Sequence, residues 1–476
     1  MNKRHVNQKI REVCEKALRK AIPTAEERQR TTRFSANLAE RLQKKLEEAG
    51  LEAEAQVEGS IAKDTWLAGE KDIDMFILVS RTEGREGFEK VLEVAKKVAG
   101  ENFLEAYAEH PYIQAEIDGF TVDFVPCFKL ESADKVVSSV DRTPFHTLYV
   151  KSRITEKTKN EVRLLKRFMR GIGTYGAEIK IGGFSGYLCE ILILYYKSFV
   201  NLLTAASDWR KQEIIDLEGY YTNREEDARK LFQEPLIVVD PVDKSRNVAS
   251  AVKEERLSEF IAAARQFLKN PSFRFFYPEP VKPLPVEEII RTMDARGTSL
   301  VFLKTVAVRA VPDVLWGQLY RSQRAIAKII RRYGFSLLRD DVWSDEKTAI
   351  VFVFELHSRF LPTVEKHLGP PVRKREDCER FLTKHLGSNL TLSGPRIEGD
   401  RWVVERKRRF TDVVELLKTN LENEASNTGI ASQISKAFLS QLEVWVNHEV
   451  KHFYLTNPSF ALFLTEYLRG KPRWLQ

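Results

Sequence analysis

Three aspartates occupy positions from which they could act together on a phosphoryl group. Asp72 and Asp74 open an apolar run that continues to Val79, and Asp123 precedes the apolar pair Phe124-Val125. Residues two apart in a strand point to the same face, so Asp72 and Asp74 are expected side by side. Acids that converge in this way repel one another unless cations lie between them. Two divalent ions would remove the repulsion and support nucleotidyl transfer, and this is the metal site that we predict.

A Gly-Ser turn, Gly59-Ser60, comes shortly before this acidic pair. Glycine lets the backbone approach a phosphate closely, and a helix that begins there offers free N–H groups to an anion. The Ser60 hydroxyl and the Lys63 ammonium could add donors to a triphosphate. A Gly-Ser pair alone usually marks an ordinary capped strand–turn–helix junction. Its position ahead of the acids favours the phosphate interpretation.

The composition describes an ordinary folded protein that is long enough for several domains. The chain has 476 residues, a net charge of +8 and a pI of about 9.0. A basic balance favours polyanionic partners such as nucleic acid, although many basic enzymes lack such a partner. The cysteines form no Cys-x-x-Cys pair. This spacing argues against a zinc ribbon or a disulfide framework and predicts a reducing, cytoplasmic environment.

No membrane-associated segment is expected. The N-terminal residues are polar and are not followed by an apolar signal core. The most apolar stretch, residues 188–203, is interrupted by Glu190 and Lys197. It is too short and too charged to cross a bilayer, so it predicts a buried helix.

The chain is predicted to be an α/β multidomain protein, and its N-terminal half to comprise a mixed α/β head, residues 1–150, and a helical neck or central domain, residues 151–270. In the head, apolar positions every four residues predict a helix over 26–49. A hairpin is expected to turn at Asp118-Gly119. Prolines crowd residues 271–285, which are therefore predicted to be a linker, because proline can continue neither a helix nor a central strand.

Beyond the linker, residues 286–400 are predicted to form a ferredoxin-like α+β domain, whose sheets often bind RNA. The expected order is a strand at 299–311, a helix at 313–333, strands at 335–339 and 348–356, a helix at 361–368 or 376–385, and a final strand at 401–406. Residues 401–476 are predicted to be a largely helical C-terminal body segment that packs on the central region.

The segment from Gly59 to Trp66, followed by Asp72-Ile73-Asp74, resembles the signature of the polymerase-β-like nucleotidyltransferase superfamily. Further segments resemble the archaeal-type, class I CCA-adding enzymes, which build or repair the C-C-A end of tRNA from CTP and ATP without a nucleic-acid template. These segments are Glu109-His110-Pro111-Tyr112, Val122-Asp123-Phe124-Val125-Pro126-Cys127, Val140-Asp141-Arg142-Thr143-Pro144-Phe145-His146, Asn160-Glu161-Val162-Arg163-Leu164-Leu165-Lys166, Gly183-Phe184-Ser185-Gly186-Tyr187-Leu188-Cys189-Glu190 and Asp240-Pro241-Val242-Asp243.

The resemblance implies that Asp72, Asp74 and Asp123 hold two Mg²⁺ ions, although the family often has Glu at the first position. It also implies that Gly59 and Ser60 approach the incoming phosphates. Lys63 stands where the family usually shows Arg, and a lysine offers a point charge rather than a bidentate fork.

Four more residues match family positions that bind the nucleotide. His146, Lys166 and Tyr175 match positions for the sugar and triphosphate, and Arg246 matches an arginine that helps to present donors to the base. From the residues alone, Lys166 is expected to project from an apolar helix, His146 to lie in a turn and Tyr175 to expose its ring between glycines. Arg246 is expected to precede a helix, where Asp240 or Asp243 could pair with it instead.

Basic clusters in the C-terminal half suit phosphate contacts along a tRNA acceptor stem, whose A-form shape is recognised through its backbone and 2′-hydroxyls. A solvated face is an equally good explanation of any one of them. The clusters are Arg331-Arg332, Arg373-Lys374-Arg375 and Arg406-Lys407-Arg408-Arg409. The segment His448-Glu449-Val450-Lys451-His452 matches the zincin motif, and we interpret it as a chance match on a C-terminal helix.

The predicted function is template-independent addition and repair of the tRNA 3′-CCA end from CTP and ATP, with release of pyrophosphate. The resemblance also implies a homodimer. Two alternatives stay open from the sequence. One is another nucleotidyltransferase, which makes oligoadenylate or poly(A) or adenylylates a small molecule. The other is a catalytically inactive RNA-binding protein.

Overall fold

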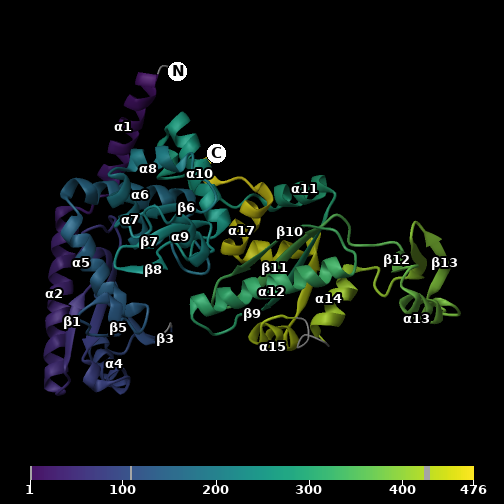
Figure 1. Cartoon of the computed structure of the whole chain (residues 1–476), viewed down its shortest axis with the longest axis horizontal. Helices are drawn as coiled ribbons and strands as arrows, with labels where there is room; N and C mark the ends of the chain where they lie inside the picture. The colour runs from purple at the N-terminus through teal and green to yellow at the C-terminus, as the bar shows by residue number, and fades with distance from the viewer. Residues whose placement is uncertain (1–2, 108–109, 423–428, 476) are drawn as a thin grey trace. The chain divides into compact units, whose positions relative to one another are not determined.

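The computed structural model describes residues 3–107, 110–422 and 429–475 (Figure 1). Glu109, in one of the segments that carry the family resemblance, lies outside them. The chain forms two compact units, Met1–Pro280 with Lys471–Gln476, and Val281–Gly470. The boundary after Pro280 falls inside the predicted linker, 271–285. Within the described residues, no helix on its own combines the length and apolarity of a membrane span, whereas α7 (Gly186–Tyr196) with α8 (Phe199–Ala206) meets both criteria jointly, across a 92° bend.

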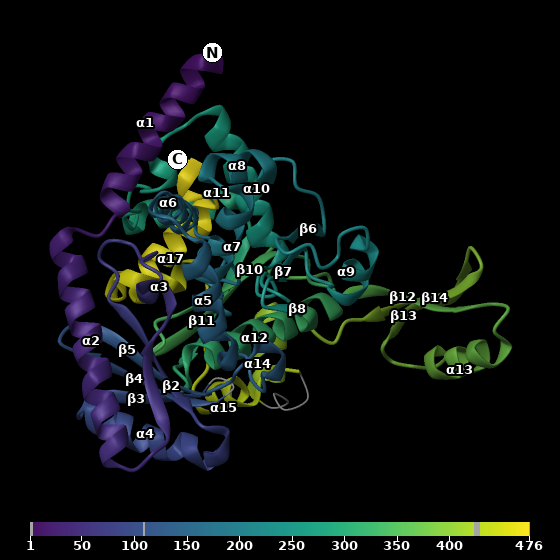
Figure 2. The same cartoon turned by 60° about the vertical axis from the view of Figure 1, so that its left-hand side comes forward.

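The head is a five-stranded sheet with helices on one face. Its strands are β1 (Ala53–Val57), β2 (Asp72–Val79), β3 (Phe103–Tyr107), β4 (Pro111–Ile117) and β5 (Phe120–Phe128). Their order is β1-β2-β5-β4-β3, and only β2 and β5 run parallel. Figure 2 shows α2 (Ala25–Glu48) beside these strands. Side chains from α2 and α4 (Glu86–Ala99) share one apolar core with the sheet, which leaves the other sheet face for the site.

The sequence dictates these elements through ordinary local signals. Thr24 and Glu27 form a capping box at the start of α2, and the leucines at 38, 42 and 46 are buried against the sheet. Asp118 and Gly119 both have positive φ, 51° and 77°, as the tight turn of the β4–β5 hairpin requires. The predicted helix and hairpin are confirmed.

The neck completes the first unit around a second core, in which phenylalanine rings pack edge to face. Lys197 in the left-handed conformation divides the apolar stretch 188–203 into two helices, α7 and α8. The remaining helices of this unit are α1 (Lys3–Ala21), α3 (Gly59–Ala62), α5 (Thr143–Arg153), α6 (Glu156–Ile172), α9 (Glu225–Leu231) and α10 (Glu254–Lys269). A small sheet is formed by β6 (Glu213–Asp216), β7 (Leu236–Asp240) and β8 (Asp243–Asn247).

The second unit contains a ferredoxin-like sheet of β9 (Ser299–Val306), β10 (Leu337–Ser344), β11 (Ala349–Leu356) and β15 (Glu443–Val446), in the order β10-β11-β9-β15. In Figure 1, α12 (Pro312–Arg332) lies along this sheet. Further helices of this unit are α11 (Val286–Arg296), α14 (Val413–Glu422), α15 (Ser432–Ser440), α16 (Lys451–Thr456) and α17 (Pro458–Arg469).

The predicted members of the ferredoxin-like unit are partly wrong. The last strand is β15, not 401–406, because β15 pairs with β9, while residues Arg401–Lys407 form β14 in another sheet. That sheet joins β12 (Val364–Pro371), β13 (Thr391–Glu398) and β14, with α13 (Arg375–His385), as an insertion. Residues 361–368 are therefore no helix. The prediction that residues 401–476 pack on the central region is also wrong, since residues up to Gly470 belong to the second unit.

Candidate active site

The structure brings the predicted aspartates to one face of the head sheet. β2 and β5 are parallel neighbours, and Asp74 lies directly opposite Asp123 in their register. Asp72 precedes Asp74 by two residues in β2, so the strand's alternation places both side chains on the same face. The three carboxylates, called the acidic trio below, lie at the start of that face, which ends in the small apolar cluster of Phe76, Leu78 and Cys127.

Burial and mutual repulsion disfavour ionisation of the acidic trio. Burial, then the neighbouring Asp123 carboxylate, raise the pKa of Asp74 to about 6, against the opposing effect of Lys63. Burial also raises the pKa of Asp72. Burial and the nearby negative charge of Asp72 raise the pKa of Asp123. Gln114 Nε2 donates a hydrogen bond of 2.8 Å to Asp123 Oδ1. The trio therefore carries more negative charge than its surroundings balance, and this fits a cation site.

The donor set also indicates which kind of cation fits. Among the described residues, no three His, Cys, Asp or Glu side chains are arranged so that they enclose a metal ion by themselves. Mg²⁺ seldom has an all-protein cage, because it binds one or two carboxylates and completes its shell with water and substrate phosphates. An acidic trio on an open sheet face matches that pattern. The aspartates would hold a divalent ion once phosphate oxygens supply the remaining ligands.

Gly59 makes room for the acidic trio. Its φ is +67°, and a Cβ added there would lie 1.7 Å from Asp74 Oδ2. The Glu58 N–H donates to the Asp74 carbonyl over 2.9 Å, which fixes the turn against β2. Ser60 lies in α3, which has only four residues, so the turn offers individual N–H groups rather than a helix dipole. Only glycine fits between the turn and Asp74.

The two lysines predicted to meet phosphates are buried around one acid, Glu190. Lys63 Nζ donates to Glu190 Oε2 over 2.6 Å, and Lys166 Nζ lies 3.5 Å from Glu190 Oε1. Thr65 links them, because its hydroxyl donates to Glu190 and accepts from Lys166. The expectation that Lys166 projects from the core is wrong. Its side chain is 1% exposed, since a buried carboxylate is available to pair with it.

A second buried acid, Asp240, gathers His146 and Arg246. Asp240 Oδ2 lies 2.9 Å from His146 Nε2 and 2.7 Å from Arg246 Nη1, and its other oxygen accepts from the Tyr187 hydroxyl. Burial lowers the pKa of His146 despite this acid. His146 stacks on Tyr187 with ring centroids 3.9 Å apart. Two local expectations are wrong: His146 lies in α5 rather than a turn, and Arg246 lies in strand β8 rather than before a helix.

Tyr175 lies close to the Glu190 group, although its ring is only partly exposed. It forms an isolated bridge with Phe184, and Arg170 lies over its ring at 5.0 Å. A Cβ on Gly186 would lie 3.2 Å from the Tyr175 hydroxyl and 3.5 Å from Lys166 Nζ. Gly186 therefore leaves the tyrosine hydroxyl and the lysine amine facing the same small space.

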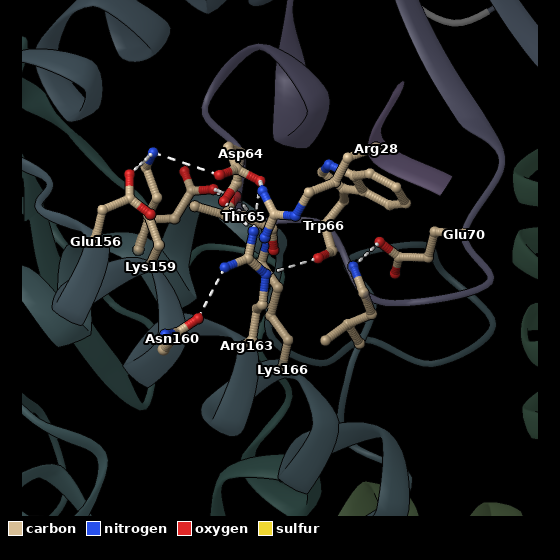
Figure 3. A network of polar contacts seen from close by, with 12 residues as sticks. Arg28, Asp64, Thr65, Trp66, Glu70, Glu156, Lys159, Asn160, Arg163 and Lys166 are labelled. Atoms are coloured by element: carbon tan, nitrogen blue, oxygen red, sulfur yellow. Dashed lines mark hydrogen bonds and ion pairs between the residues drawn. The ribbon is translucent and has the colours of Figure 1, made fainter. Parts of the chain in front are cut away.

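The loop that carries Lys63 and Thr65 is fastened to α6 by a stripe of basic residues (Figure 3). Arg163 Nη2 donates to Asp64 over 2.5 Å, Lys166 donates to the Thr65 carbonyl, and Arg170 pairs with Glu70. These bases recur at intervals of three and four residues, the spacing of one helix face. The sequence prediction missed this role, although that spacing was a readable signal.

The predicted RNA-binding clusters all lie in the second unit. Arg373, Lys374 and Arg375 form an exposed turn at the start of α13. The cluster Arg406-Lys407-Arg408-Arg409 is partly paired, since Glu365 accepts hydrogen bonds from Arg406 and Arg408. A cavity of about 480 Å³ is lined by Arg332, Tyr333, Glu365, Leu390, Arg406, Lys407, Arg408, Arg409 and Phe410. This basic hollow suits a phosphate backbone.

The zincin-like segment has no zincin geometry. His448 lies in a 3-10 turn and contacts Asp294 Oδ1 at 2.7 Å, while Glu449 caps the turn by accepting from the Val446 N–H. His452 falls in the next helix, α16. A zincin needs both histidines on one face of one helix, so the pattern is a chance match.

Comparison with known proteins covers both units. Three family models match successive parts of the chain: "Nucleotidyltransferase domain" at residues 37–146, "tRNA nucleotidyltransferase, second domain" at 160–277 and "CCA-adding enzyme, C-terminal domain" at 296–447. A solved structure described as "Structural Basis for the Activity of a Cytoplasmic RNA Terminal U-transferase" has 15% identity and a TM-score of 0.44 over 58% of this chain and 100% of its own, a likeness too loose to carry an argument.

Curated relatives resemble the chain almost from end to end. The CCA-adding enzyme of Methanosarcina acetivorans is 37% identical over 95% of this chain and 97% of its own length. That of Methanothermobacter thermautotrophicus is 41% identical over 79% and 83%, and that of Halorubrum lacusprofundi is 35% identical over 95% and 97%. These matches confirm the resemblance and the nucleotidyltransferase fold of the head. The chain belongs to the family of archaeal-type CCA-adding enzymes.

Proposed function

We propose that this protein adds and repairs the 3′-terminal CCA of tRNA, using CTP twice and ATP once. The observation that carries the proposal is the acidic trio held against Gly59 in a chain that matches CCA-adding enzymes over nearly its whole length. In each step the 3′ oxygen of the RNA bonds to the α-phosphorus of the nucleotide. The bond to the β-phosphate bridging oxygen breaks, and pyrophosphate and one proton are released.

The residues divide this work by location. Asp72, Asp74 and Asp123 would hold two Mg²⁺ ions, which supply charge stabilisation and activate the attacking hydroxyl when bound. Lys63 and Lys166 lie within electrostatic reach of Asp74 and bring positive charge to the triphosphate. Arg246, oriented by Asp240, offers its remaining N–H groups to the nucleobase. His146, which contacts the same carboxylate, would lie beside the sugar and triphosphate. Tyr175 would border the sugar.

The partners follow from the same proposal. The tRNA acceptor stem would lie against the basic clusters of the second unit, because the cavity beside Arg406–Arg409 is rich in guanidinium groups. A homodimer is proposed from the family resemblance, and light scattering of the purified protein tests it. A reducing, cytoplasmic location is proposed because the cysteines are buried and unpaired.

The test is incorporation of labelled CTP and ATP into a tRNA transcript that ends at the discriminator base, with and without Mg²⁺. We expect CCA addition that stops after three nucleotides and requires the divalent ion. Asp123→Ala should abolish incorporation while tRNA binding persists. Glu89→Gln, which changes an exposed carboxylate on α4, the helix that covers the opposite face of the head sheet, serves as the control. Long adenylate tails, or untouched tRNA, would contradict the proposal.

A further inference from the structure

Glu190 is a buried acid to which neither the metal site nor the nucleotide contacts assign a role. Its side chain is 0% exposed and lies on α7, in the neck. Its carboxylate accepts from Lys63, from the Thr65 hydroxyl at 2.5 Å and, more distantly, from Lys166. Burial raises its pKa, but the two lysines outweigh burial and hold that pKa below its usual value. It is therefore an ionised carboxylate inside the protein.

Glu190 joins residues that come from different parts of the first unit. Lys63 ends the turn at α3 in the head, whereas Lys166 comes from α6 in the neck. A lysine side chain loses much rotamer freedom when it is fixed, so each amine needs a partner that holds it in place. Glu190 contacts both amines: it pairs with Lys63 at 2.6 Å, and it reaches Lys166 at 3.5 Å and through the Thr65 hydroxyl. Because Glu190 is fully enclosed, it reaches substrate only through these amines.

The charge count favours a role in triphosphate binding over simple core packing. Two buried ammonium groups repel one another, and one carboxylate compensates for only one of them. The remaining positive charge lies near Asp74, whose pKa both lysines lower. Asp74 faces this charge, and when its carboxylate binds a divalent ion, the phosphates of a nucleoside triphosphate would take its place beside the lysines.

We propose that Glu190 is a positioning residue that holds the ammonium groups of Lys63 and Lys166 where the triphosphate binds. This inference rests on the proposed function for the identity of the substrate, a nucleoside triphosphate. It assigns the phosphate-binding geometry to a residue of the neck, although the acidic trio lies in the head.

The experiment compares Glu190→Gln with wild type. Glutamine keeps the size of the side chain but places an amide N–H₂, a donor, beside two ammonium donors. Binding of CTP and of CMP is measured by calorimetry with Mg²⁺ and without tRNA, so that no turnover occurs. We expect the Kd for CTP to rise about tenfold or more, the change that corresponds to one charge-assisted hydrogen bond, and the Kd for CMP to stay within about twofold. In the tRNA assay KM for CTP should rise more than kcat falls.

Matched variants separate this effect from a loss of folding. Glu161→Gln is the control, because Glu161 is a neck carboxylate that caps α8 through the Phe199 N–H. Glu190→Asp, which keeps the charge, should restore part of the CTP affinity. If Glu190→Gln does not fold, Thr65→Val removes the hydroxyl between Lys166 and Glu190. It should weaken CTP binding in the same selective way.

Three results would overturn the proposal. Equal weakening of CTP and CMP would show a general structural role. Unchanged CTP affinity would show that Lys63 and Lys166 keep their positions without the Glu190 carboxylate. Tighter CTP binding would show that Glu190 competes with phosphate for the lysines. Failure of the proposed function is distinguishable, because wild type would then add no nucleotide to tRNA, whereas the CTP and CMP comparison would still report on Glu190.

Discussion

The contact between Gly59 and Asp74 allows a quantitative test of the active-site geometry. In Gly59→Ala the new Cβ would lie 1.7 Å from Asp74 Oδ2, and real Cβ atoms essentially never come within 3.0 Å of another atom. The two atoms must therefore separate by a further 1.3 Å (3.0 − 1.7). Because the turn is tied to β2 by the Glu58 N–H, we expect the Asp74 carboxylate to rotate away.

Two effects of this change have different magnitudes. Alanine in the left-handed region costs about 1–2 kcal/mol of stability. Displacement of a reacting group by about 1 Å costs on the order of 100-fold in rate. We therefore expect Gly59→Ala to lower kcat for CTP incorporation about 100-fold or more, with a modest loss of unfolding free energy and unchanged tRNA binding.

Gly50→Ala provides the matched control. Gly50 has nearly the same backbone angle, φ +69°, but nothing lies within 4 Å of an added Cβ. It should lose a similar unfolding free energy and keep full activity. Single-turnover incorporation and denaturant unfolding on both variants give the two readouts. Gly59→Ala activity within about twofold of wild type, or an equal loss in Gly50→Ala, would refute the steric reasoning.

Three further predictions follow from charge. In EDTA, Asp74→Asn should stabilise the protein by about 1–3 kcal/mol at pH 7, because folding raises the pKa of Asp74 to about 6 and ionisation therefore opposes folding. That gain should shrink as pH falls from 6 and vanish below about pH 4 in denaturant unfolding, and a gain independent of pH would contradict it. Arg163→Met should cost about 1–3 kcal/mol, since it removes the hydrogen bonds to Asp64 and to the Trp66 carbonyl, although Arg28 and Lys159 still pair with Asp64. A double-mutant cycle with Asp64→Asn should show coupling above about 1 kcal/mol, and additive effects would refute it. Arg409→Ala should reduce the salt slope of tRNA binding by about one, whereas an unchanged slope would place Arg409 off the RNA.

The head could be predicted from sequence because its signals are local. The alternation in β2 and the Asp118-Gly119 turn each depend on neighbouring residues, so the hairpin and the shared face of Asp72 and Asp74 followed directly. The parallel pairing of β2 with β5 needed more, because it joins residues far apart in the chain. The family resemblance implied that Asp123 acts with Asp72 and Asp74, but it did not predict this strand pairing.

The errors occurred where a distant partner decides the outcome. Lys166 was expected to leave the core, since an isolated lysine usually does, but Glu190 lies beside it across 24 residues. Residues 401–406 do form a strand, and only hydrogen bonding to β12 and β13 shows that they belong to the inserted sheet. Propensity predicts that a segment is a strand, but it does not predict the neighbour with which it pairs.

The head and the neck form one catalytic structure rather than two separate modules. The acidic trio and Gly59 come from the head, but the anchors Glu190 and Asp240 come from α7 and β7 of the neck. The basic stripe on α6 fastens the Lys63 loop between them. The phosphate-binding charges are therefore set by contacts that no isolated head could make. This coupling explains why Lys63, a residue of the head, is paired with an acid 127 residues away.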